Sequence, residues 1–293
     1  MIRKLVIFGV GLIGGSLALA LRQAQYCEQV VGCSRNAAHL QKAVELGVID
    51  CFTLDPQEAV QDADMVLLAV PMGAMAKLLQ QIKPVLPANA ILTDAGSTKG
   101  SVVAEVEQVF GKDFSRFVPG HPIAGREQSG VEAAIPDLFV NRRVILTPQS
   151  HTAPHAIAAV SALWQASGAI VEYMAVDLHD QVLAATSHLP HVLAFSLVDT
   201  LLNLPMREAL FRYAAGGFRD FTRIASSDPT MWRDICLANH EAIVTVIEKL
   251  QADLSEFAAL MQAQDGEALY ERMLRAKQAR DSYIAYLENG KLP

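Results

Sequence analysis

The first residues of the chain pass from an apolar run to a glycine cluster and back to an apolar run. Residues 5–8 are branched or aromatic, as expected of a fully buried parallel strand. Residues 17–21 alternate leucine with alanine, both good helix formers. Gly9, Gly11 and Gly14 fall between the two runs. The pattern predicts a strand, a tight turn and a helix in direct succession.

Alternation of strands and helices continues to about residue 175. We expect further strands over residues 29–33, 64–70, 90–93, 116–118, 142–147 and 169–173, and helices over 36–47, 75–85 and 153–167. From residue 177 onward, the spacing of apolar residues is that of helices, and no further strand is predicted. Helices are expected over residues 177–203, 230–264 and 267–287, with a glycine-led loop over 216–223.

A glycine turn between a first strand and a first helix is typical of a dinucleotide site. Gly9 permits the tight turn, Gly11 lets the backbone approach a pyrophosphate, and Gly14 allows close packing of helix on strand. A merely structural glycine turn is the alternative. The expected cofactor contacts are Gly9, Gly11, Leu12, Ile13 and Gly14, together with Val70 and Pro71 at the end of a later strand.

The fold class that follows is α/β. An N-terminal Rossmann-type dinucleotide-binding domain is expected over residues 1–175, and an all-α substrate-binding and dimerisation domain over 176–293. A membrane or export segment over residues 5–21 is disfavoured, because its glycines would weaken a spanning helix. The long helices have little core of their own, so we expect them to pair in a homodimer.

The end of the second strand bears on which dinucleotide binds. NAD sites usually place Asp or Glu there to hold the ribose hydroxyls. This chain has Ser34-Arg35-Asn36 instead, and a guanidinium offers bidentate donors to a phosphate. The sequence therefore predicts a preference for NADP, with NAD also possible, unless Arg35 is only a solvated side chain.

Two turns that follow strands carry candidate chemistry. Ser97 lies in the stretch DAGSTKG and is either a site residue or a helix N-cap. His121 is held between glycine and proline, so its backbone is fixed and its imidazole can accept a proton near neutral pH. The alternative is a histidine that only hydrogen-bonds its own turn.

The helical half has two candidate regions. Ser187-His188-Leu189-Pro190-His191 interrupts a long apolar helix, and its histidines are either ligand contacts or packed core residues. The loop Gly216-Gly217-Phe218-Arg219-Asp220-Phe221-Thr222-Arg223 offers Arg219 and Arg223 to substrate carboxylates, although one of them could pair with Asp220.

Composition and net charge limit the kinds of molecule that the chain is expected to bind. The 293 residues are 52% hydrophobic and 19% charged, which describes a well-cored globular protein. A net charge of −7 without a Lys/Arg cluster disfavours nucleic acid. The four cysteines show no CxxC spacing and suit a reduced, cytoplasmic protein, and no convincing metal set occurs.

Taken together, the motifs FGVGLIGGS, DAGSTKG, GHPIAG, SHLPH, GGFRDFTRIA and SDPTMWRDI resemble those of the prephenate and arogenate dehydrogenases of tyrosine biosynthesis. The resemblance implies an oxidative decarboxylation in which a hydride passes from C4 of a cyclohexadienol to NADP or NAD. It implies that His121 is the general base and that Ser97 orients the C4 hydroxyl. It also implies that Ser187, His191 and Arg223 line the substrate site, supported by Glu127, Asp220 and Trp232.

The sequence leaves several points open. It does not separate prephenate from arogenate, although Ser34 and Arg35 resemble the Ser-Arg pairs of arogenate-using family members, and this resemblance tilts the expectation slightly toward arogenate. It does not say whether tyrosine inhibits at the active site. A β-hydroxyacid-type dehydrogenase and a non-catalytic NADP-binding protein are the alternatives. The catalytic-lysine motif of β-hydroxyacid-type dehydrogenases is not found in this sequence. A non-catalytic NADP-binding protein would leave His121, His191 and Arg223 unexplained.

Overall fold

A six-stranded parallel sheet forms the centre of the first half of the chain in the computed structural model, which describes residues 1–126 and 128–289. In spatial order its strands are β3 (Cys51–Thr53), β2 (Cys27–Cys33), β1 (Ile2–Phe8), β4 (Met65–Leu68), β5 (Ile91–Asp94) and β6 (Phe117–Val118). The order reverses between β1 and β4, where Phe8 pairs with Leu68. Ligands of open α/β sheets bind at the carboxyl ends of strands at such a switch point.

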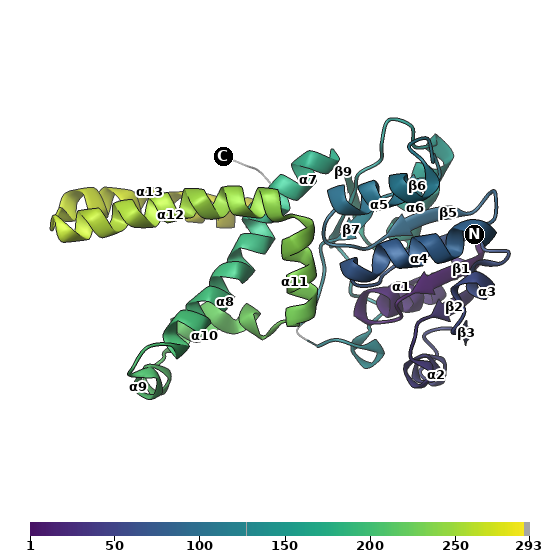
Figure 1. Ribbon diagram of the computed structural model, residues 1–293, viewed down its shortest axis with the longest axis horizontal. Helices are drawn as coiled ribbons and strands as arrows, with labels where there is room; N and C mark the ends of the chain where they lie inside the picture. The colour runs from purple at the N-terminus through teal and green to yellow at the C-terminus, as the bar shows by residue number, and fades with distance from the viewer. Residues whose placement is uncertain (127, 290–293) are drawn as a thin grey trace. The chain divides into compact units, whose positions relative to one another are not determined.

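Helices cover both faces of this sheet (Figure 1). The first face carries α1 (Leu12–Gln23), α2 (Ala37–Glu45) and α6 (Pro154–Ala166). The second carries α3 (Pro56–Val60), α4 (Met75–Ile82) and α5 (Gly100–Phe110). Each face has its own apolar core, so the strands between them are buried on both sides, as the apolar runs in the sequence require.

A second, three-stranded sheet continues the fold. Its order is β7 (Gly120–Pro122), β8 (Arg143–Leu146) and β9 (Ile170–Tyr173). β7 runs antiparallel to β8, and β8 runs parallel to β9. Gly120 also lies against β5, because a Cβ on it would stand 2.9 Å from the carbonyl oxygen of Asp94. The arrangement brings His121 beside the end of β5.

Helices make up the rest of the described chain. They are α7 (Val176–Leu183), the π-helix η4 (Ala184–His188), α8 (Leu189–Leu202), α9 (Arg207–Arg212), α10 (Gly216–Thr222), the 3₁₀ turn η5 (Arg223–Ser226), α11 (Pro229–Ala238), α12 (His240–Gln262) and α13 (Gly266–Asn289). Short 3₁₀ turns η1 (Met72–Ala74), η2 (Lys83–Val85) and η3 (Val131–Ala133) lie in the first half. The predicted α/β domain followed by helices is confirmed.

Two sequence predictions for the helical half are wrong. Residues 216–223 were expected to be a loop but form α10 and the start of η5. Residues 230–264 were expected to form one helix, but the helix ends at Ala238 and a new one begins at His240. The break lies at Asn239, whose buried amide donates to the carbonyl oxygen of Asp180 and to His188. Tertiary hydrogen bonds therefore interrupt a pattern that is continuous in sequence.

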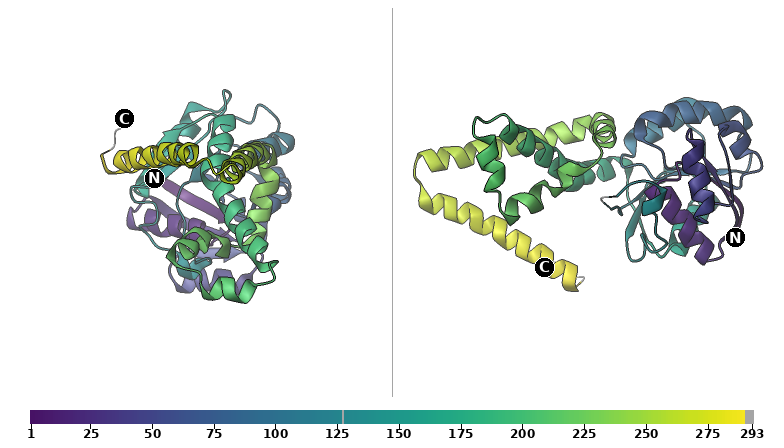
Figure 2. Two further views of the ribbon diagram at one scale, coloured as in Figure 1. Left: turned by 90° about the vertical axis from the view of Figure 1, so that its left-hand side faces the viewer. Right: turned by 90° about the horizontal axis from the view of Figure 1, so that it is seen from below.

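Two compact units divide the chain, residues 1–243 and residues 244–293. The second unit consists of the remainder of α12 and of α13, which form a helical hairpin (Figure 2). Arg272 joins the two helices. Its guanidinium pairs with Asp253 at 3.0 Å and with Glu256, and it lies 4.5 Å from the ring centre of Phe257.

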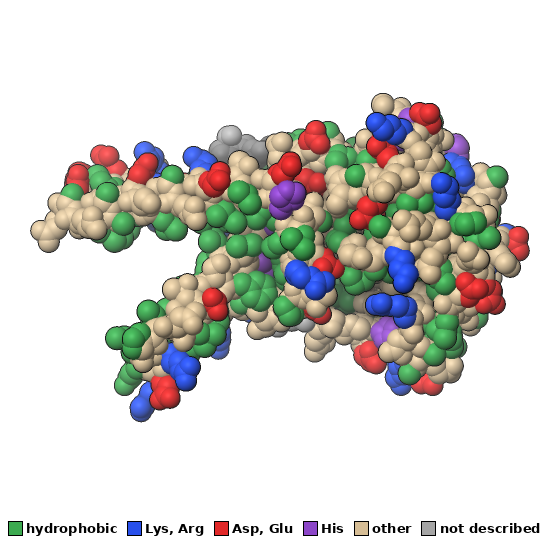
Figure 3. All heavy atoms as spheres, viewed as in Figure 1, with side chains coloured by type: hydrophobic (Ala, Val, Ile, Leu, Met, Phe, Trp, Pro, Cys, Tyr) green, Lys and Arg blue, Asp and Glu red, His purple; other side chains and the backbone are tan. Residues whose placement is uncertain are grey.

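Large apolar side chains are exposed at the end of α8 and over α9 (Figure 3). They include Leu202, Leu204, Met206, Phe211 and Tyr213, the last of which is 77% exposed. Within residues 1–126 and 128–289, one helical run is long and apolar enough to span a membrane, residues Val176–Leu202. Only 22% of its most apolar window is buried.

Candidate functional site

The glycine turn has the shape that a dinucleotide requires. Gly9 has a φ of +88°, and a Cβ on it would lie 2.3 Å from the carbonyl oxygen of Ala69. A Cβ on Gly14 would lie 2.4 Å from the carbonyl oxygen of Gly9, so α1 packs directly on the turn. By contrast, no atom lies within 4 Å of a Cβ on Gly11. The helix therefore has open space at its start.

The start of α1 has the free donors that an anion needs. Gly11 is the N-cap and supplies no side-chain cap, and the first turn, which begins with Leu12 and Ile13, holds no acidic residue. The amides of a helix start attract phosphate through their hydrogen bonds and the helix dipole. The turn thus fits the pyrophosphate of a dinucleotide.

Ser34 and Arg35 follow the carboxyl end of β2, beside this turn. The hydroxyl of Ser34 accepts a hydrogen bond from the amide of Asn36 at 3.3 Å, and Asn36 caps α2. Arg35 is exposed and makes no hydrogen bond or ion pair within the described residues. Val70 and Pro71 follow β4, whose end adjoins that of β1. These four predicted cofactor residues therefore lie at the ends of neighbouring strands.

A buried ion pair ties the Ser97 turn to the His121 strand. The carboxylate of Asp94, at the end of β5, pairs with the ammonium of Lys99, and both side chains are fully buried. Asp94 also accepts from the amides of Gly96 at 2.8 Å and Gly120 at 3.0 Å. Lys99 donates to the carbonyl oxygen of Gly120 at 2.7 Å. The pair therefore fixes the backbone next to both Ser97 and His121.

Ser97 does not cap a helix. The N-cap of α5 is Lys99, which supplies no side-chain cap. Instead the carboxylate of Asp180, on α7, accepts from the amides of Lys99 at 2.8 Å and Gly100 at 2.7 Å. The hydroxyl of Ser97 is half-buried and makes no hydrogen bond within the described chain. It is therefore available to a ligand.

His121 stands at the end of a hydrogen-bonded chain of three side chains. Its Nδ1 lies 2.9 Å from Nε2 of His179, and Nδ1 of His179 lies 2.7 Å from Asp180. Burial alone would raise the pKa of Asp180, but hydrogen bonds from His179 and from two backbone amides lower it. Asp180 is therefore an ionised acceptor.

This charge assigns the protons along the chain. A carboxylate only accepts, so Nδ1 of His179 carries a proton and donates to Asp180. When this is the only ring proton of His179, its Nε2 accepts and Nδ1 of His121 donates. The lone pair of His121 is left at Nε2. Burial first, and then the positive charge of Lys99, holds the pKa of His121 well below 6.5. The imidazole is thus a neutral base at pH 7.

Aromatic rings of the helical half form a second cluster. His191 donates from Nδ1 to the carbonyl oxygen of Ser187 at 2.9 Å and stacks on Trp232 with ring centres 3.7 Å apart. His188 accepts at Nδ1 from the amide of Asn239. Burial lowers the pKa of His188 to about 4. The indole nitrogen of Trp232 is buried without a hydrogen-bond partner in residues 1–126 and 128–289.

The two clusters meet through Asn239. Its amide nitrogen donates to the carbonyl oxygen of Asp180 at 2.9 Å as well as to His188 at 3.2 Å, and His188 lies edge-on to Trp232. Burial lowers the pKa of His191, and the charge of Arg223 lowers it further. Arg223 begins η5, which packs against α8. Contacts therefore run without interruption from His121 to the aromatic cluster.

Asp220, a further predicted site residue, is exposed on α10. The carboxylate of Asp220 stands 4.0 Å from Arg219, and their side chains are 78% and 87% exposed. Glu127 lies outside the described residues. Sequence reasoning missed His179, Asp180, Lys99, Asp94 and Asn239. Four of them are buried, and the available signal for Asp94 was its place directly after an apolar strand.

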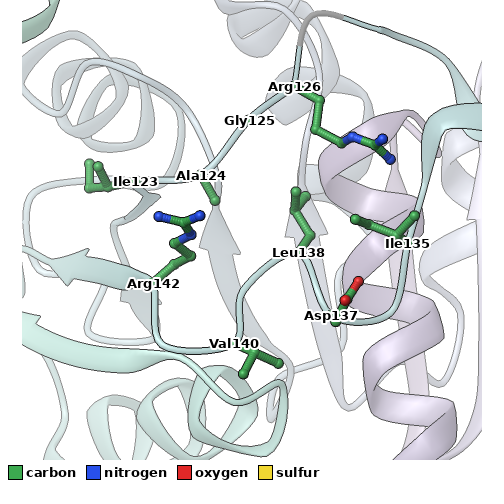
Figure 4. Close-up of a pocket in the computed structure, with 9 residues that line it drawn as sticks. All are labelled: Ile123, Ala124, Gly125, Arg126, Ile135, Asp137, Leu138, Val140 and Arg142. Atoms are coloured by element: carbon green, nitrogen blue, oxygen red, sulfur yellow. The ribbon is translucent and has the colours of Figure 1, made fainter.

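A separate hollow of about 470 Å³ lies on the loop that follows β7 (Figure 4). Arg126 and Arg142 lie on opposite sides of it, and Asp137 is the carboxylate among the residues that line it. Neither Ser97 nor His121 lines it.

Comparison with known proteins places the chain in a family. Residues 17–173 match the nucleotide-binding domain of prephenate dehydrogenase, and residues 175–275 match the prephenate dehydrogenase dimerization domain. The cyclohexadienyl dehydrogenase of Zymomonas mobilis is 38% identical over 282 residues, which is 95% of each chain.

Solved structures agree with these matches. The prephenate dehydrogenase of Aquifex aeolicus in complex with hydroxyphenyl propionate and NAD⁺ is 39% identical with a TM-score of 0.90, covering 97% of this chain and 99% of that one. The arogenate dehydrogenase of Synechocystis is 28% identical with a TM-score of 0.81, covering 96% and 99%. With both halves matched in order and nearly the whole length covered, the chain belongs to the prephenate/arogenate dehydrogenase family of NAD(P)-dependent oxidoreductases.

Proposed function

We propose that this enzyme oxidatively decarboxylates arogenate, prephenate or both, in tyrosine biosynthesis. The products are tyrosine from arogenate and 4-hydroxyphenylpyruvate from prephenate, together with CO₂ and the reduced cofactor. The observation that carries the proposal is the chain Asp180–His179–His121, which ends in an imidazole that is neutral at pH 7. Oxidation of a C4 hydroxyl needs such a base beside a dinucleotide site.

His121 accepts the proton of the C4 hydroxyl at Nε2. His179 and Asp180 hold the ring in the tautomer that leaves this nitrogen free, and they stabilise the imidazolium that forms. Ser97 orients the hydroxyl. A bound nicotinamide would supply the acceptor for the hydride of C4. As the ring carboxylate leaves as CO₂ and the ring becomes aromatic, the proton held by His121 returns to the phenol oxygen, so no net proton is released.

Substrate carboxylates are assigned to the helical half. Arg223 supplies the positive charge, and Trp232 has an indole N–H without a partner in the described chain. His191 and Ser187 line the same wall, and Glu127 and Asp220 are proposed to support it. A buried donor without a partner is costly, so a ligand acceptor at Trp232 recovers that cost on binding.

The cofactor is proposed to be NADP in preference to NAD. Gly9, Gly11, Leu12, Ile13 and Gly14 hold the pyrophosphate, and Val70, Pro71 and Ser97 border the nicotinamide side. Ser34 and Arg35 stand where an NAD-specific site carries a carboxylate. The exposed guanidinium of Arg35 is suited to a 2′-phosphate.

The functional enzyme is proposed to be a cytoplasmic homodimer. Residues 1–175 carry the cofactor, and residues 176–293 bind substrate and form the dimer. The exposed apolar side chains over α8 and α9 support this division, as does the low burial of residues Val176–Leu202. The four free cysteines suit a reducing compartment.

Steady-state kinetics with both substrates and both cofactors test the proposal. Turnover is expected with at least one substrate, and faster at low cofactor concentration with NADP⁺. His121→Asn is expected to lower kcat by about 10²- to 10⁴-fold with little change in cofactor binding. Arg35→Ala is expected to weaken NADP⁺ binding much more than NAD⁺ binding. Absence of turnover in all four combinations would refute the activity, and equal losses for both cofactors would refute the role of Arg35.

A further inference from the structure

A carboxylate of the helical half reaches the turn that follows β4. Asp234, on α11, accepts a hydrogen bond at Oδ2 from the amide of Gly73 at 3.2 Å. A Cβ on Gly73 would lie 2.9 Å from the same oxygen, so the two groups meet in direct contact. Asp234 is 9% exposed, and its Oδ1 is held by the guanidinium of Arg233 at 2.6 and 2.9 Å. Both carboxylate oxygens of Asp234 therefore have hydrogen-bond partners, and the contact with Gly73 is well defined.

The turn that Asp234 holds belongs to the cofactor side. Gly73 follows Val70 and Pro71, and this turn begins where the carboxyl end of β4 adjoins that of β1. Met72 of the same turn presses on the Ser97 segment, because a Cβ on Gly96 would lie 2.8 Å from its sulfur atom. A shift of the turn would therefore move both the cofactor contacts and the backbone beside Ser97.

The helix that carries Asp234 belongs to the substrate side. Trp232 lies two residues earlier on α11, is 7% exposed and stacks on His191. The N-terminus of this helix is set separately by Asp228, which accepts from the amides of Thr230 and Met231. The contact with Gly73 thus joins the aromatic wall of the substrate site to the turn beside the nicotinamide.

We infer that Asp234 is a positioning residue that holds the substrate wall in register with the cofactor. The inference rests on the proposed function, since it takes Trp232 as part of the substrate site. Hydride transfer depends steeply on the distance between donor and acceptor carbons, and a displacement near 1 Å can cost about 10²-fold in rate. Loss of the contact separates the two halves of the site without removing any group that touches either ligand.

Three variants test the inference, with kcat measured per active site. Asp234→Ala is expected to lower kcat about 10- to 100-fold, while the Kd of NADP⁺ alone changes by less than about 3-fold. Asp234→Asn keeps an acceptor for the amide of Gly73 and is expected to recover most of kcat. The matched control is Asp228→Ala, which destabilises the same helix by removing its cap. It is expected to lower the melting temperature with kcat near normal.

The possible outcomes separate the inference from the proposed function. A wild-type enzyme without activity on either substrate would refute the function itself. With wild-type activity established, an unchanged kcat in Asp234→Ala would overturn the inference. An equal loss of kcat in Asp228→Ala would overturn it too, because the effect would then be one of helix stability. If Asp234→Ala fails to fold, Gly73→Ala disturbs the contact from the other side, and an unchanged kcat there would likewise overturn it.

Discussion

The buried pair of Asp94 and Lys99 sets the charge around His121 as well as the backbone beside it. Removing only one partner would strand a buried charge at a cost of about 3–5 kcal/mol, so the two are best neutralised together. Lys99 is, after burial, the largest contributor that lowers the pKa of His121. The pair therefore influences the range of pH over which the base is available.

The double variant Asp94→Asn/Lys99→Met tests this influence. His121 works only when neutral, so activity falls as the pH drops through its pKa. Because the depressed pKa lies below 6.5, the acid limb of the wild-type kcat/KM profile is expected below that value. Without Lys99 the pKa rises, and the acid limb should move to higher pH. A pH profile with an unmoved acid limb would contradict this role.

Glu105, on α5, destabilises the fold when its carboxyl group is ionised. Its Oε2 has no hydrogen-bond partner within the described residues, and burial, followed by the charge of Asp94, raises the pKa of Glu105 to about 7. A carboxyl whose pKa rises on folding stabilises the protein fully below its unfolded value of 4.5. That contribution is lost as the pH rises through about 7.

Glu105→Gln should remove this dependence. We expect the free energy of unfolding of the variant to rise relative to that of the wild type between pH 5 and pH 8. The difference should reach about 1–2 kcal/mol at pH 8. Urea denaturation at several pH values measures the difference. A difference that stays constant with pH would show that Glu105 titrates normally.

Single residues also show where prediction from sequence stopped. His121 and Ser97 stand out because each follows a predicted strand, although His121 lies in strand β7 and not in the turn expected there. Their roles stay predictions. His179 is 58 positions from His121, and no local pattern marks that pairing. Lys99 lies in a motif that reads as a charged loop, although its side chain is fully buried. A buried lysine is rare enough that sequence alone favours the exposed interpretation.

At the scale of elements, prediction succeeded where a local pattern decides the structure. Strands buried on both faces appear as apolar runs, so most strands of the parallel sheet were predictable, with the exception of β3. The antiparallel pairing of β7 with β8 was not, because it depends on a long connection rather than on a turn signal. The break at Asn239 likewise depends on acceptors supplied by α7 and η4.

Two glycines of the first turn should respond differently to the same change. Gly14→Ala places a Cβ 2.4 Å from a backbone oxygen and 2.8 Å from Ile7, so α1 must move away from β1. It should lower both stability, by about 1–3 kcal/mol, and cofactor affinity. A Cβ at position 11 has open space around it, so Gly11→Ala should lower cofactor affinity without lowering stability. Thermal unfolding and cofactor titration of the two variants check this, and equal stability losses would contradict it.

At the scale of the whole molecule, the exposed apolar surface of α8 and α9 predicts association. Sedimentation should give twice the chain mass of 31.7 kDa. Because a dimer is stabilised by its own concentration, the melting temperature should rise with protein concentration. A monomeric mass with a melting temperature independent of concentration would refute the proposed homodimer.

The cap that Asp180 places on α5 also limits how this enzyme can be recombined with its relatives. The two family domains meet at residues 173–175, an obvious crossover point for chimeras. Yet α5 belongs to the first domain and takes its cap from the second, and the compact unit runs on to residue 243. A functional hybrid would therefore have to inherit residues 94–121 and 176–239 from the same parent.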